Sequence, residues 1–78
     1  MMATYNYGQI ALALRRAQFI QTAASKHQRW EKIEADGTGR RVILNANKLA
    51  PIPPQVLERL LHCAGMDERE LRRLLGFS

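Results

Sequence analysis

The spacing of hydrophobic residues changes twice along the chain, and these changes divide it into helices and strands. Ile10, Leu14 and Ala17 recur at the spacing of one helix face. Over residues 19–45 the apolar residues alternate with polar ones or form short runs rich in strand-forming types. Helical spacing returns after Pro54. The predicted elements are a helix over 9–18, strands over 19–23, 27–33 and 40–45, and helices over 54–64 and 67–75.

Turn-forming residues mark the boundaries between these elements. Asp36 and Gly37 form a strong hairpin signal between the second and third strands. Pro54 is expected to open the second helix, because proline fits the first helical turn. Gly65 is expected to end that helix, and Asp67, with a glutamate three residues later, is expected to cap the next one.

Length and composition fit one small domain over residues 1–78. The chain is 46% hydrophobic and 24% charged, which is typical of a folded protein and not of a disordered one. The element order predicts an α+β fold, with a three-stranded antiparallel sheet that carries the helices on one face. The single cysteine, Cys63, excludes an internal disulfide. We find no export signal and no run of about 18 to 20 apolar residues, so we expect a cytoplasmic protein without a membrane partner.

Positive charge is concentrated in the first two-thirds of the chain. Lysine and arginine number 12 against 7 acidic residues, for a net charge of +5. Residues 1–48 carry eight basic and three acidic side chains, whereas the remainder is balanced. A one-sided basic surface suits a polyanion such as nucleic acid, because neutralising phosphates releases counterions. A net charge of this size also serves solubility alone.

Three segments carry motifs that occur in the same order in a known protein family. Residues 12–19, Leu-Ala-Leu-Arg-Arg-Ala-Gln-Phe, form the end of a helix and the entry into a strand. Residues 25–30 place an aromatic residue three positions after a histidine, and residues 57–66 form an apolar helix that ends in Ala-Gly. Together, over about residues 10–75, these segments resemble the HicA (YcfA-like) toxins of bacterial toxin–antitoxin pairs.

The chain departs from the family pattern at three places. Gln18 stands where the family usually has glycine, and Ser25-Lys26 stands where Gly-Ser precedes the histidine. After Leu44 the third strand continues with Asn45, where the family often has Pro and His. The last departure removes a possible second imidazole.

The resemblance implies a fold like that of double-stranded-RNA-binding domains and a specific activity. Members of this family are toxins of type II toxin–antitoxin systems that cleave mRNA without a metal. A HicB-like antitoxin inhibits them, and the two proteins form a hetero-oligomer. The resemblance therefore implies mRNA and the antitoxin as partners, with no cofactor and no metal site.

His27 is the candidate catalytic residue. RNA cleavage without a metal needs a base for the 2′-hydroxyl proton, and an imidazole titrates near neutral pH. We expect Lys26, Arg29, Arg40 and Arg41 to bind phosphate. The acid for the leaving group stays open between Lys26, a water molecule and His27 itself.

The other conspicuous side chains have simpler interpretations. Trp30 is expected to pack in the core, although an aromatic residue on a strand can also stack on a base. His62 is expected to lie on a solvated helix surface, and Cys63 to act as a small packing residue. Three other functions are compatible with the sequence: a helix-turn-helix DNA binder built from residues 54–75, a non-catalytic RNA- or protein-binding module with the same fold, and a small protein that acts only by binding another protein.

Overall fold

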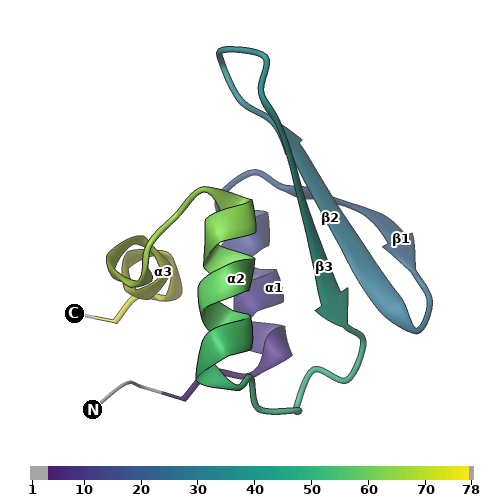
Figure 1. The fold of residues 1–78 in the computed structure, drawn as a ribbon, viewed down its shortest axis with the longest axis vertical. Coiled ribbons are helices and arrows are strands. Elements are labelled where there is room, and N and C mark those ends of the chain that lie inside the picture. The colour runs from purple at the N-terminus through teal and green to yellow at the C-terminus, as the bar shows by residue number, and fades with distance from the viewer. Residues whose placement is uncertain (1–3, 78) are drawn as a thin grey trace.

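The computed structural model describes residues 4–77 and has the predicted α+β architecture (Figure 1). Strands β1, β2 and β3 form an antiparallel sheet in that order. Helices α1 and α2 lie against one face of the sheet, and α3 packs on α1 on the side away from it. The elements are α1 (Tyr7–Arg16), β1 (Ile20–Ala24), β2 (His27–Ile33), β3 (Gly39–Asn45), α2 (Pro54–Ala64) and α3 (Glu68–Leu75).

Helix α1 begins at Tyr7, two residues before the predicted start, because a capping box precedes it. The Asn6 side chain accepts a hydrogen bond from the Gln9 backbone amide at 2.8 Å. The Gln9 side chain accepts one from the Asn6 amide at 2.9 Å. The helix ends at Arg16, and Gln18 then adopts a left-handed conformation with φ of 73°. The helix therefore begins two residues before the predicted start and ends two residues before the predicted end at residue 18.

The strand ends also differ slightly from the prediction. Strand β1 begins and ends one residue later than expected, and β3 begins one residue earlier at Gly39. Pairing of β2 with β3 is regular over its whole length, from His27 opposite Asn45 to Ile33 opposite Gly39. Pairing of β1 with β2 shifts at a bulge between Gln21 and Ala23. The Asp36–Gly37 turn closes the β2–β3 hairpin as predicted, with Gly37 at φ of 91°.

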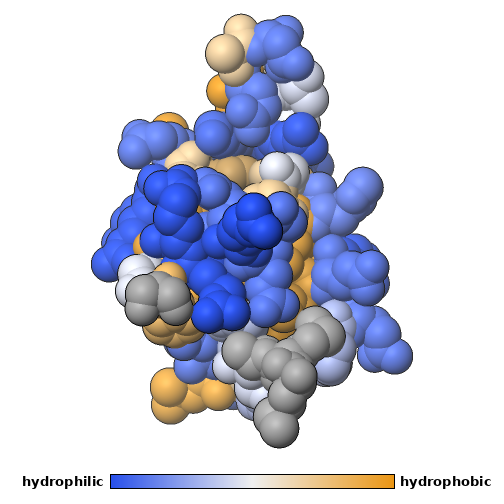
Figure 2. Space-filling model, turned by 90° about the vertical axis from the view of Figure 1, so that its left-hand side faces the viewer, coloured by the Kyte–Doolittle hydropathy of each residue, from blue (hydrophilic) through white to orange (hydrophobic). Residues whose placement is uncertain are grey.

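The later helix ends follow the predicted signals. Gly65 and Gly76 end α2 and α3 in the left-handed conformation. The Asp67 side chain accepts a hydrogen bond from the Glu70 amide at 2.8 Å, so α3 begins just after it. Leu71 of α3 is fully buried, whereas the helix turns a hydrophilic surface outward (Figure 2).

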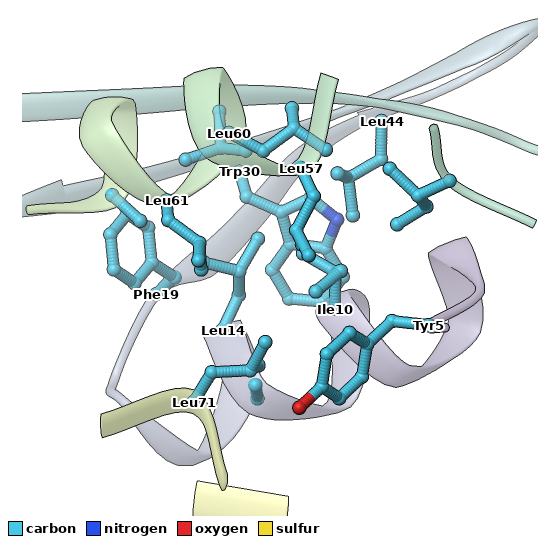
Figure 3. Packing of buried hydrophobic residues seen from close by; sticks show 14 residues of the cluster. Tyr5, Ile10, Leu14, Phe19, Trp30, Leu44, Leu57, Leu60, Leu61 and Leu71 are labelled. Carbon is cyan, nitrogen blue, oxygen red and sulfur yellow. The ribbon is translucent and has the colours of Figure 1, made fainter. Parts of the chain in front are cut away.

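The core lies between the sheet and the helices and includes Trp30, which is 2% exposed (Figure 3). Its indole Nε1 donates a hydrogen bond to Gln28 Oε1 at 3.2 Å. Residues outside the predicted elements also contribute. Tyr5 is buried before α1, where burial raises the pKa of its hydroxyl, and the Ile52 amide donates to the Tyr5 carbonyl at 2.8 Å. The core interpretation of Trp30 is confirmed.

Cys63 is exposed, so its interpretation as a packing residue was wrong. The buried stripe of α2 runs through Leu57, Leu60, Leu61 and Ala64. A residue at position 63 falls to one side of this stripe. His62 is exposed on α2, as predicted.

We predict that Gln18→Gly stabilises the protein by about 1 kcal/mol. The left-handed conformation costs a residue with a Cβ about 1 kcal/mol of conformational energy, whereas glycine adopts it without this cost. Urea denaturation monitored by Trp30 fluorescence measures the change. Ala17→Gly is the matched control, because Ala17 has φ of −86° and should lose stability on the same substitution. Equal effects at the two positions would contradict the prediction.

Candidate nucleic-acid site at the edge of the sheet

A cleft of about 430 Å³ lies where the edge strand β3 meets α2. It contains His27, the candidate catalytic residue, together with side chains from both layers of the fold. Its lining residues are Tyr7, His27, Arg41, Ile43, Asn45, Val56, Arg59, Leu60 and Cys63. Its volume lies within the range typical of small-molecule sites, towards the lower end.

The position of His27 follows from the alternation of side chains along β2. Trp30 points into the core, so the residues in phase with it, including Gln28, face the helices. His27 and Arg29 are out of phase with Trp30 and face the open side of the sheet. His27 is exposed at the first position of β2, opposite Asn45. Burial of one indole therefore presents the imidazole to solvent.

Arg59 is the cation of the cleft that the sequence did not reveal. It is exposed on α2, on the same face as Val56 and Cys63, and it lines the cleft with His27. The i, i+3, i+7 spacing of Val56, Arg59 and Cys63 defines this face, but spacing says nothing about what lies opposite. The packing of α2 against β3 brings the face to His27.

The predicted phosphate-binding residues divide into two groups. Lys26 is exposed in the β1–β2 turn next to His27, and Arg41 lines the cleft. Arg29 shares the open face of the sheet with them. Arg40 lies on the opposite face, where its guanidinium carbon would be 2.6 Å from a Cβ at Gly65. Arg40 therefore packs beside Gly65 at the end of α2, apart from the other three predicted phosphate-binding residues.

Glu31 organises the arginines of the open face. Its Oε1 lies 3.0 Å from Arg29 Nε, and its Oε2 lies 3.8 Å from Arg41 Nη2. Thr22 Oγ1 donates a hydrogen bond to Glu31 Oε1 at 2.7 Å and accepts one from Arg29 Nε at 2.9 Å. The hydrogen bond from Thr22, followed by the charges of Arg41 and Arg29, lowers the pKa of the Glu31 carboxyl. The carboxylate lies between these two arginines.

We predict that Thr22→Val raises the pKa of Glu31 towards its ordinary value. The substitution removes the main cause of the lowered pKa and keeps the β-branched shape. A carboxyl whose pKa is lower in the folded chain than in the unfolded chain stabilises the fold at any pH above its unfolded-state pKa. This stabilisation is lost as the pH falls through the folded-state pKa. The variant should therefore lose less stability on acidification than the original chain.

An NMR pH titration of the Glu31 carboxyl carbon measures this pKa directly. Thr38→Val is the matched control, because Thr38 lowers the pKa of Asp36 through a side-chain hydrogen bond. That variant should move the titration of Asp36 and leave Glu31 unchanged. A Glu31 titration that Thr22→Val does not move would contradict the assigned cause.

Comparisons with known proteins give no match. No protein-family model, no curated protein and no solved structure matches this chain. Within residues 4–77, no helix is long and apolar enough to cross a membrane. The same residues contain no group of three or more His, Cys, Asp or Glu side chains placed to hold a metal ion.

Proposed function

We propose that this protein is an RNA endonuclease that uses His27 as its general base. The observation that carries the proposal is the cleft in which His27 lies with Arg41 and Arg59. A base and two cations from three different elements meet there. This is the minimum set for attack of a 2′-hydroxyl on the adjacent phosphate.

The reaction divides between the base and the cations. His27 takes the proton of the 2′-hydroxyl, and O2′ attacks the phosphorus. The P–O5′ bond breaks, which leaves a 2′,3′-cyclic phosphate and a 5′-hydroxyl. Arg41 and Arg59 stabilise the charge that develops on the non-bridging oxygens. O5′ receives its proton from Lys26, a water molecule or the protonated His27.

Single-stranded RNA is the substrate that fits this site best. The attacking group is the 2′-hydroxyl, which DNA lacks. The positive groups near the cleft, including exposed Lys26, are placed to hold the phosphates on either side of the cleaved bond. The helix-turn-helix alternative has weaker support, because Arg73 of α3 is paired with Glu70.

The biological role that we propose is that of a HicA-like toxin that cleaves mRNA in the cytoplasm. Its partner is a HicB-like antitoxin, and the two proteins form a hetero-oligomer. An acidic surface on the antitoxin would be attracted to Lys26 and to the arginines of the open face. Such a partner would cover the cleft and keep RNA away from His27.

We predict that His27→Ala lowers the rate of RNA cleavage by roughly 10²- to 10⁴-fold, as expected for the loss of a general base. Purified chain and a fluorescent single-stranded RNA give the rate, and induced expression gives the effect on growth. His62→Ala is the matched control, because His62 is exposed on α2 and does not line the cleft. A folded His27→Ala variant that cleaves RNA at the original rate would refute the assignment.

We predict that Arg59→Gln lowers kcat by roughly 10²-fold, the usual effect of removing one oxyanion donor. Arg69→Gln serves as the control, because Arg69 is exposed on α3 and makes the same change in net charge. Single-turnover cleavage at saturating RNA separates the chemical step from binding. Equal losses in the two variants would mean that Arg59 acts only through the overall charge.

A further inference from the structure

We propose that a second pocket, on the other side of β2, binds one nucleobase of the RNA strand; this inference rests on the proposed ribonuclease function. The pocket has a volume of about 200 Å³ and lies between α1 and the strands β1 and β2. It is smaller than the range typical of drug-sized ligands, and it therefore suits a single planar ring system.

The pocket exists because the helices leave part of the sheet uncovered. Helices α1 and α2 pack mainly against β3, whereas β1 diverges from them (Figure 1). Gln21 of β1 and Gln28 of β2 point to the helix side of the sheet and are only partly buried. Ala11 and Leu12 of α1 supply the apolar wall.

The orientation of both glutamine amides is determined by their neighbours. Trp30 Nε1 can only donate, so Gln28 turns Oε1 towards it, at 3.2 Å. The Ala23 carbonyl can only accept, so Gln21 turns Nε2 towards it, at 3.3 Å. Among the described residues, Gln28 Nε2 and Gln21 Oε1 are left without a partner. The pocket therefore offers one donor group and one acceptor.

A nucleobase edge is the complement of this pair. Adenine and cytosine each place a ring-nitrogen acceptor beside an exocyclic amino donor. Unstacked bases of single-stranded RNA are recognised through such edges and through stacking on aromatic rings or guanidinium planes. Arg15 supplies that plane at the pocket, where its guanidinium is held over the Trp30 ring at 5.6 Å from the centroid.

Lys48 adds a phosphate contact at the rim. It lies in the loop after β3 and lines the pocket. The Gly8 amide donates to the Lys48 carbonyl at 2.9 Å. A Cβ at Gly8 would lie 3.2 Å from Lys48 Cβ and from its carbonyl oxygen, so glycine permits the close approach of α1 to this loop.

The pocket and the His27 cleft are neighbours across two elements. His27 lines the cleft and Gln28 lines the pocket; likewise Tyr7 lines the cleft and Gly8 the pocket. An RNA strand whose scissile phosphate lies at His27 would pass the end of β2 and the loop after β3, where the Ala46 amide donates to the Lys26 carbonyl, to reach the pocket. The pocket therefore binds a base close to the cleaved bond and contributes to the choice of cleavage site.

The test is an NMR titration of the ¹⁵N-labelled full chain with adenosine, cytidine, their 5′-monophosphates and inorganic phosphate. We expect both nucleosides to shift the amide signals of Gln21 and Gln28 and the indole signal of Trp30. The monophosphates should bind more tightly because of the cations at the rim. Gln28→Glu keeps an acceptor for Trp30 but loses the outward donor, so nucleoside affinity should fall about tenfold, the effect of one hydrogen bond.

Two further variants keep the result interpretable. Gln55→Glu makes the same chemical change at an exposed position of α2 and should leave nucleoside binding unchanged. Arg15→Ala removes the stacking plane and should weaken binding even if Gln28→Glu does not fold. The inference is overturned if neither nucleoside shifts the glutamine signals, if phosphate alone reproduces the shifts, or if folded Gln28→Glu binds nucleosides as tightly as the original chain.

The titration does not depend on catalysis, so its failure differs from that of the proposed function. Nucleoside binding without any RNA cleavage would refute the proposed ribonuclease function but not the proposed base-binding pocket. RNA cleavage without nucleoside binding would refute the pocket alone. If both hold, Gln28→Glu should change the base preference next to the cleaved bond, and mapping of cleavage sites would show it.

Discussion

Burial of the Trp30 indole is the interaction on which both candidate sites depend. Removing a buried tryptophan side chain typically costs about 3–5 kcal/mol, so a register that exposed Trp30 would be strongly disfavoured. With the indole in the core, His27 must face the open side of β2, and Gln28 must face the helices. The same indole holds Gln28 by a hydrogen bond and supports Arg15. Burial of this one side chain thus determines the positions of an imidazole, an amide and a guanidinium group.

Ion pairs with Glu31 then fix two of the arginines on the open face of the sheet. Glu31 and Thr22 hold Arg29 and Arg41 on the open face, which lowers the local positive charge but keeps the guanidinium groups in place. Preorganised donors of this kind lose less side-chain entropy when an anion binds. The hydrogen bond from Thr22 is the main cause of the lowered pKa of the Glu31 carboxyl, and the charges of Arg41 and Arg29 add to it.

The sequence predicted the element order, and it predicted most element ends to within one residue, because these follow from periodicity and from turn residues such as Gly65. The start of α1 was missed, because its capping box is formed by Asn6 and Gln9, outside the apolar stripe that defined the helix. The end of α1 was missed as well, because the left-handed residue that follows it is Gln18. A left-handed residue is expected to be glycine, so glutamine gave no signal that the helix had ended.

The sequence by itself determined the layers of the fold and the exposure of His27, since both depend on the period of neighbouring residues. Only the tertiary structure decided which residues share a site with it. Arg59 reaches the cleft because α2 packs on β3, and Arg40, next to Arg41 in the chain, is carried to the other face of the sheet. Periodicity reports which face of an element a residue occupies. What lies opposite that face is decided by packing between elements far apart in the chain.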